Sequence, residues 1–296
     1  MTKKHPVILH TDIGSDIDDS WALLMLLRQP QWDIKMILCD TGDVRYRGAL
    51  AAASLKGFGS EGIPIALGVN DESTKPMAGL LSGRELEEYN GPVWENGAEK
   101  LVEIVRASAE PVTLVSIGPA PAIAAALDMA PEIAGKIRFA GMFGSFRIGY
   151  FGEPTPSREY NVIHDIPAAK KIFSAKWLEF ILTPLDTCGI VTLEGERFIK
   201  LKNSGNSRTS FLLDHYDGWR AGGNSEYPEN TSSVLYDTVA VHLASSFEYL
   251  EMANVRLSVN DDGYTVEDPA AQECKVAVSW KDLEAYKDFL TDTLLS

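Results

Sequence analysis

The chain has 296 residues, 45% hydrophobic and 23% charged, an ordinary composition for a globular protein with a sizeable buried core. Its formal net charge of −15 argues against nucleic-acid or anionic-membrane partners, which attract basic surfaces. Three widely spaced cysteines, Cys39, Cys188 and Cys274, argue against a disulfide framework and favour a reducing, cytoplasmic location. The sequence shows neither a signal peptide nor an apolar run of the roughly 18 residues that a membrane span needs.

Strand-like and helix-like segments alternate along the first two thirds of the chain. Short apolar runs predict strands at 6–9, 34–38, 63–69, 112–117, 137–143 and 180–185. Apolar spacing, helix starts and glycine or proline punctuation predict helices at 20–28, 45–58, 95–109, 119–129 and 167–175. This order predicts an α/β fold in which an open, mostly parallel (mixed) sheet carries helices on both faces.

The last third of the chain has a different pattern. Residues 208–250 are mainly helical in character, with a loop rich in Gly, Asn and Pro at 222–233. Two strands at 255–259 and 274–280 are expected to be joined by the turn Asp261-Asp262-Gly263, and a helix is expected at 281–294. Since no repeat, low-complexity tract or linker is visible, we expect one domain spanning residues 1–296.

Four aspartates, Asp12, Asp16, Asp18 and Asp19, follow the first predicted strand within eight positions. The carboxyl ends of parallel strands are where ligands bind in such sheets. Carboxylates packed together there repel one another, so they must be protonated or must hold a hard cation. Because His10 is the one nitrogen or sulfur ligand nearby, calcium or magnesium is favoured over zinc. A solvated acidic loop at a helix start is the alternative interpretation.

Two other acidic motifs fit less well. An EF-hand loop has a central glycine and a distal glutamate between two helices, whereas here the glycine comes early and a strand comes first. Asp16 and Asp18 have the D-x-D spacing of aspartyl-nucleophile phosphatases, but they lie several residues beyond the strand end.

Nucleoside hydrolases of the inosine–uridine-preferring type open with a D-x-D-P-G-x-D-D element, and the segment TDIGSDIDDSWALLMLL resembles it. Here Ile13 replaces the proline, and two extra residues precede the acidic pair. Four further segments resemble family elements in the same order along the chain: CDTGDVRYRGAL, VTLVSIGPAPAIAAAL, SREYNVIHDIPAAKKIF and SSVLYDTVAV. The resemblance covers nearly the whole chain and implies a Rossmann-like nucleoside hydrolase fold.

The resemblance also implies a set of metal ligands and the cofactor that they hold. It assigns calcium to one main-chain carbonyl and four carboxylates: Ile117, Asp12, Asp18, Asp19 and Asp237. Asp12 matches the family's general base, although the two-residue insertion leaves Asp16 as an alternative base or an added ligand.

The ribose and base contacts follow from the same resemblance. Glu159, Asn161 and Asp43 match positions that hold the ribose. Tyr236 stands where many members have the histidine that protonates the departing base, and His164 and Trp94 are further candidates for base contact.

The implied activity is hydrolysis of the N-glycosidic bond of ribonucleosides to ribose and free base, by a calcium-bound water. The substrate would be a small nucleoside, and the protein a homodimer or homotetramer. Two alternatives remain open because family histidines are missing: a metal-dependent hydrolase of another ribosyl compound, and a non-catalytic relative that binds nucleoside or ribose.

Overall fold

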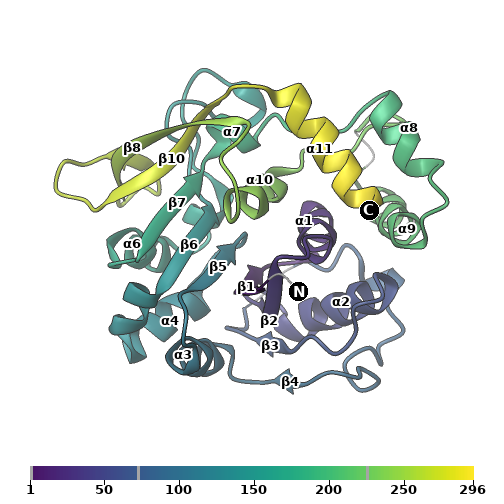
Figure 1. Ribbon diagram of the computed structural model, residues 1–296, viewed down its shortest axis with the longest axis horizontal. Coiled ribbons are helices and arrows are strands. Elements are labelled where there is room, and N and C mark those ends of the chain that lie inside the picture. The colour runs from purple at the N-terminus through teal and green to yellow at the C-terminus, as the bar shows by residue number, and fades with distance from the viewer. Residues whose placement is uncertain (1–2, 72–73, 225–226) are drawn as a thin grey trace.

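The computed structural model describes residues 3–71, 74–224 and 227–296. Ten strands in these ranges form one sheet in the order β4-β3-β2-β1-β5-β6-β7-β10-β8-β9 (Figure 1). The strands are β1 (His5–Thr11), β2 (Trp32–Cys39), β3 (Ile65–Leu67), β4 (Val93–Trp94), β5 (Val112–Ser116), β6 (Ile137–Met142), β7 (Glu179–Thr183), β8 (Leu250–Val259), β9 (Thr265–Glu267) and β10 (Glu273–Trp280). The first eight strands in that order, from β4 at one edge to β10, are parallel to one another. Strand β8 pairs antiparallel with β10, and β9 pairs antiparallel with β8.

Helices lie between most of the parallel strands, as the alternating sequence pattern predicts. They are α1 (Asp18–Leu27), α2 (Val44–Gly57), α3 (Gly97–Ala107), α4 (Pro121–Met129), α5 (Tyr160–Ile163), α6 (Ile166–Ser174), α7 (Leu185–Cys188), α8 (Glu196–Lys202), α9 (Ser207–Ala221), α10 (Tyr236–Leu243) and α11 (Leu283–Leu295). Short 3-10 turns occupy Ala78–Leu80, Pro131–Lys136 and Tyr150–Gly152. In the described part of the chain, no helix is long and apolar enough to cross a membrane.

Two buried cores lie on opposite faces of the sheet because successive strand side chains point to opposite sides. Val7 and Leu9 of β1 belong to one core, which includes side chains of α1, α2, α10 and α11. Ile8 belongs to the other, which includes side chains of α3, α4 and α6. The predicted fold class, a mostly parallel sheet covered on both faces, is therefore confirmed.

The antiparallel end of the sheet differs from the sequence prediction. The turn at Asp261-Asp262-Gly263 joins β8 to the short strand β9, and β10 then returns along the other side of β8. The predicted direct hairpin from 255–259 to 274–280 is therefore wrong in its connection. A three-residue strand, Thr265–Glu267, carries too little hydrophobic periodicity to be recognised beside a loop.

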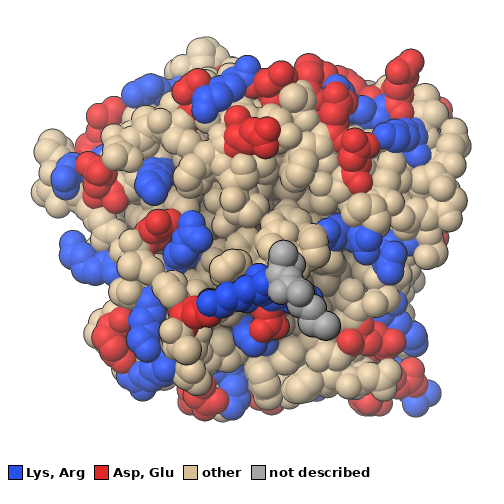
Figure 2. Space-filling view, in the orientation of Figure 1, with Lys and Arg blue, Asp and Glu red and all other residues tan. Residues whose placement is uncertain are grey.

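Charged side chains are interspersed on the face shown in Figure 2, where blue and red residues alternate rather than gather by sign. Many charged side chains of the described residues form exposed ion pairs, for example Arg106 with Glu132 and Lys171 with Asp128. Such pairs contribute little to stability, so the two cores rather than the surface charges hold the fold together.

Candidate active site

A cavity of about 410 Å³ opens at the carboxyl ends of β1, β5 and β6. Nine residues that the sequence singled out line it: Asp12, Asp16, Asp18, Asp19, Ile117, Glu159, Asn161, Tyr236 and Asp237. They come from segments more than 200 residues apart, which the parallel sheet brings to one edge. The structure therefore assembles most of the predicted site in one place.

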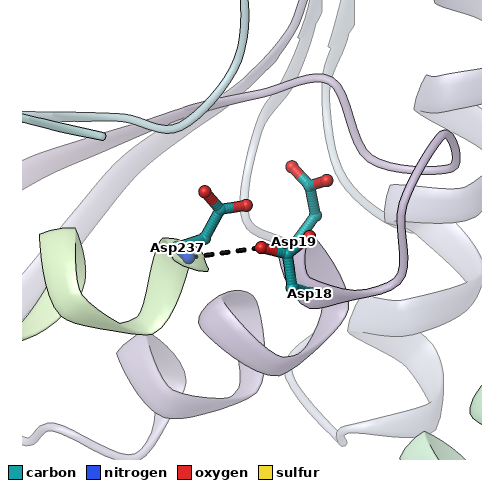
Figure 3. Close-up of side chains that lie close together, drawn as sticks. All are labelled: Asp18, Asp19 and Asp237. Atoms are coloured by element: carbon teal, nitrogen blue, oxygen red, sulfur yellow. Dashed lines mark hydrogen bonds between the residues drawn. The ribbon is translucent and has the colours of Figure 1, made fainter. Parts of the chain in front are cut away.

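Three of the aspartates that line this cavity lie close together (Figure 3). Asp18 and Asp19 begin α1, and Asp237 lies in the first turn of α10, which packs against α1. One carboxylate oxygen from each residue lies within 4.8 Å of the others, and all three residues are buried. The Asp237 main-chain N–H donates to Asp18 Oδ2 at 3.2 Å, and the Thr11 hydroxyl donates to Asp19.

The loop before α1 is held in one shape by contacts with α2. Gly14 has φ +105°, and a Cβ there would lie 2.3 Å from the Leu50 side chain, so this turn requires glycine. The Tyr46 hydroxyl donates to the Gly14 carbonyl at 3.0 Å. The two-residue insertion therefore forms an ordered turn that carries Asp16 into the cavity.

Arg47, only 1% exposed, is the cation closest to this loop among the described residues. Its guanidinium donates to the main-chain carbonyl of Asp12 and, at 3.0 Å, to Ser15 Oγ. Its Nη2 lies 3.7 Å from Asp12 Oδ2. Arg47 therefore holds the main chain and the carboxylate of Asp12 in place. This role was not predicted from the sequence. The available signal was an arginine in the first turn of a helix close to the acidic loop.

Burial raises the pKa of all four buried aspartates, Asp12, Asp18, Asp19 and Asp237. Neighbouring carboxylates raise the pKa of Asp18, Asp19 and Asp237 further, whereas Arg47 partly offsets the effect of burial on Asp12. A group of buried carboxylates that resists ionisation in this way is stabilised by a bound cation. All the candidate metal ligands are oxygen atoms, the ligand type that calcium and magnesium prefer.

Glu159 and Asn161 lie at the start of α5, on another side of the cavity. Glu159 caps this helix: Oε1 accepts from the Asn161 N–H at 2.7 Å, and Oε2 accepts from the Gly144 N–H at 2.9 Å. Asn161 Nδ2 donates to the Met142 carbonyl at 2.9 Å. Burial raises the pKa of Glu159 to about 7 in spite of these main-chain donors. Both side chains are rigidly placed to receive a polar ligand.

Aromatic side chains form the wall beside the acidic groups. Tyr150 and Tyr236 meet edge to face, with ring centroids 6.2 Å apart. The Tyr150 hydroxyl accepts from the Tyr160 main-chain N–H at 2.8 Å, and Trp219 Nε1 donates to the Ser15 carbonyl at 3.3 Å. Burial raises the pKa of Tyr150 and of Tyr236 above the ordinary tyrosine value, so both keep their protons at neutral pH.

Seven of the described lining residues were not predicted from the sequence: Ser15, Thr74, Met142, Tyr150, Tyr160, Trp219 and Asn224. Trp219 lies in the last turn of α9, and Tyr150 lies in a 3-10 turn; the positions of both elements depend on tertiary packing. Of the aromatic residues in this set, only Tyr160, beside Glu159 and Asn161, stood next to predicted site residues in the sequence.

Three predicted contact residues are absent from the described lining of the cavity. Asp43 instead caps α2, accepting the main-chain N–H groups of Arg45 and Tyr46, and pairs with Lys75. Trp94 lies on the outermost parallel strand, β4, under Lys100. A substrate in the cavity would not meet these two side chains in this arrangement.

His164, the third of these residues, lies one turn beyond the rim residue Tyr160. Its ring centroid is 5.3 Å from that of Tyr160, and its Nε2 is 3.8 Å from Asp71 Oδ2. His164 therefore packs against the lining residue Tyr160 and does not itself line the cavity in which the base was expected to lie.

Comparison with known proteins places this site in context. The chain is 30% identical over 224 residues to the non-specific ribonucleoside hydrolase RihC of Klebsiella pneumoniae, covering 71% of this chain and 72% of the relative. It is 29% identical over 228 residues to the pyrimidine-specific ribonucleoside hydrolase RihA of Enterobacter sp. (strain 638), covering 71% and 70%.

Solved structures show the same fold at lower identity. A plant nucleoside hydrolase, the PpNRh1 enzyme, superposes with a TM-score of 0.82 at 20% identity over 99% of each chain. A purine-preferring ribonucleoside hydrolase from Gardnerella vaginalis superposes with a TM-score of 0.76 at 20% identity over 98% of each chain. The profile of one enzyme family matches residues 7–288. The chain therefore belongs to the inosine-uridine preferring nucleoside hydrolase family and is an N-ribohydrolase that cleaves ribonucleosides.

Proposed function

We propose that this hydrolase cleaves the N-glycosidic bond of ribonucleosides with calcium held by Asp18, Asp19, Asp237, Asp12 and the Ile117 carbonyl. The observation that carries the proposal is the buried aspartate cluster in a cavity that Glu159 and Asn161 also line. When bound, calcium would hold the sugar hydroxyls and lower the pKa of a coordinated water.

The chain's own residues supply the remaining chemistry. Glu159 and Asn161 bind and orient the ribose, since their side chains are fixed by main-chain hydrogen bonds and face the cavity. Asp12 takes the proton of the attacking water, because it lies at the end of β1 with Arg47 fixing its position. Asp16 is the alternative base, since its side chain lines the same cavity.

Tyr236 and its neighbours contact the departing base. The Tyr236 hydroxyl has a pKa raised by burial and by Asp18, so we assign it hydrogen-bond donation rather than full proton transfer. Asp43, His164 and Trp94 have no direct role in this mechanism because they are absent from the described cavity lining.

Replacing Asp12 and Asp16 separately with asparagine tests which of the two carboxylates is the general base that takes the proton of the attacking water. The Asp12→Asn variant should lose about 10²–10⁴-fold in kcat, the usual contribution of a general base, with a smaller change in KM. Asp16→Asn should retain most of kcat. Asp128→Asn, which removes an exposed carboxylate paired with Lys171, is the matched control. Near-normal kcat in Asp12→Asn together with loss in Asp16→Asn would reverse the assignment.

Three broader properties complete the proposal. Residues 1–296 form one domain, supported by the single sheet that contains every described strand. The protein acts in the cytoplasm, supported by three buried cysteines that form no disulfide. It assembles as a homodimer or homotetramer and binds a small nucleoside rather than nucleic acid or membrane, as the family resemblance and the net charge of −15 favour.

A further inference from the structure

All five histidines of the chain lie outside the cavity lining. His10 is fully buried behind the site, with Nε2 3.0 Å from Asp40 Oδ2 and Nδ1 2.9 Å from Ser116 Oγ. The other four lie on the surface, among core aromatic rings or beside the rim: His5, His215, His242 and His164. No imidazole therefore belongs to the described lining of the cavity, and the His164 ring packs against the lining residue Tyr160.

The donors that remain near the base position are weak acids. The described lining contains no lysine or cysteine, and beside the carboxyl groups its polar side chains are hydroxyls, the Trp219 indole and the amides of Asn161 and Asn224. Tyrosine hydroxyls, with an ordinary pKa of about 10, keep their protons at neutral pH. Glu159 is engaged through both oxygens by main-chain N–H groups. The hydroxyl, indole and amide groups of the described lining can therefore donate hydrogen bonds, but none of them is acidic enough to protonate a neutral leaving group.

The cavity is also strongly acidic. Six carboxyl groups of the described residues line it: Asp12, Asp16, Asp18, Asp19, Glu159 and Asp237. A divalent cation and Arg47 together supply three positive charges, so the site keeps a negative field when the carboxylates are ionised. Such a field lowers the free energy of a positively charged ligand and raises that of an anionic one.

Asp16 and the aromatic wall face the same part of the cavity. Trp219 Nε1 donates to the carbonyl of Ser15, the residue next to Asp16. Tyr236 and Asp16 line the same cavity. Aromatic faces and a nearby carboxylate both attract a cationic ring, since the face of an aromatic ring is electron-rich.

We propose, resting on the proposed hydrolase function, that the site prefers N-ribosyl heterocycles whose ring carries a positive charge. In their hydrolysis the C1′–N bond breaks and both of its electrons stay on the nitrogen, so the ring leaves as a neutral base. The water oxygen bonds to C1′, and its proton passes to Asp12. The leaving group takes up no proton, which matches a site without a histidine.

Because a cationic ring is also the better leaving group, the test measures binding rather than rate. The Asp12→Asn variant, slowed in hydrolysis, is titrated in the presence of calcium with nicotinamide riboside and with nicotinic acid riboside. The two share a pyridinium ring and a sugar, but the second also carries a carboxylate on the ring, which brings its net charge to zero. We expect the cation to bind at least about tenfold more tightly, with a difference that shrinks as salt is added.

A second pair, 7-methylguanosine and guanosine at pH 6, separates charge from ring shape in the same way. Adding Asp16→Asn to the Asp12→Asn variant should reduce the preference for the cation in both pairs. Equal affinity for charged and uncharged members of both pairs would overturn the inference, as would a preference for the cation that Asp16→Asn leaves unchanged.

Ribose release by the wild-type enzyme distinguishes the two levels of the proposal. If neither neutral nor cationic ribosides release ribose, the proposed function itself fails. If neutral nucleosides are cleaved and binding shows no charge preference, only the substrate inference fails. Loss of inosine cleavage in His164→Gln, with nicotinamide riboside cleavage retained, would show that His164 protonates the base and would also overturn the inference.

Discussion

Five buried carboxyl groups in the active-site cavity have pKa values above those of ordinary carboxyl groups. Asp12, Asp18, Asp19, Asp237 and Glu159 are buried, and each has a pKa raised above its ordinary value. In the unfolded chain the same groups ionise near pH 4. At pH values between the unfolded and the folded pKa of these groups, the cation-free folded protein therefore binds more protons than the unfolded chain. Its free energy of unfolding consequently depends on pH.

The sign of this dependence gives a prediction for the protein stripped of metal. For Glu159, with a pKa of about 7 folded and 4.5 unfolded, the contribution to stability is present below pH 4.5 and lost as the pH rises through 7. This one group corresponds to about 3 kcal/mol. The melting temperature of the metal-free protein should therefore fall between pH 5 and pH 8, and added calcium should raise it most at pH 8.

Scanning calorimetry at several pH values, with chelator and with excess calcium, measures this effect. Glu159→Gln should weaken the decline in the chelated protein because it removes one titrating group. A melting temperature that rises from pH 5 to pH 8 in chelator would contradict the assignment of buried, protonated carboxyls.

The sequence located these acidic residues better than it located their surroundings. Asp18 and Asp19 were predictable because they begin an apolar helix that follows the first strand after a short loop. The expectation for Asp43 came from the family resemblance, and the structure places its carboxylate on its own helix terminus. Aspartate suits both roles, and spacing alone does not distinguish a ligand from a cap.

At the scale of elements, a buried polar network joins the ends of three strands beneath the site. Asp40, which follows β2, accepts from the main-chain N–H groups of Val69 and Ala122, both at 2.8 Å. Its Oδ2 also lies 3.0 Å from His10 Nε2 on β1, and His10 in turn contacts Ser116 on β5. The network therefore sets the spacing of the strand ends that carry Asp12 and Ile117.

Replacing Asp40 with asparagine should destabilise the protein by about 2–4 kcal/mol. The amide NH₂ would face main-chain donors that now lose their acceptor in a fully buried position. Urea denaturation of the metal-loaded protein measures the change. Asp128→Asn, at an exposed ion pair, is the control and should change stability by less than about 1 kcal/mol. A loss as small for Asp40→Asn would contradict a structural role for the network.

Most strands and helices were predictable from the sequence because each buries an apolar run with a regular period. Val112–Ser116 is buried throughout and was recognised as a strand. The predicted connection from Leu250–Val259 was wrong because the intervening strand, Thr265–Glu267, is only three residues long and was not recognised. Pairing in that region depends on contacts with β10, which local sequence does not encode.

At the scale of the whole molecule, the sheet topology explains why one cavity collects residues from the whole length of the chain. Parallel strands point their carboxyl ends to the same edge, so Asp12 after β1, Ile117 after β5 and the Glu159 loop after β6 converge there. Helix α10 then brings Asp237 against α1. The residues of the acidic cluster were predictable from ordered family motifs, whereas the aromatic wall depends on how α9 packs against α1 and α2.

In our proposal the buried aspartate cluster holds the calcium on which cleavage depends. The most direct measurement is ribose release from inosine, uridine and nicotinamide riboside by chelator-stripped protein as calcium is added back. We predict negligible release without calcium, saturable recovery on its addition, and a loss of at least about 10²-fold in Asp18→Asn and in Asp237→Asn at the same calcium concentration. Full release in chelator, unchanged in both variants, would contradict the claim.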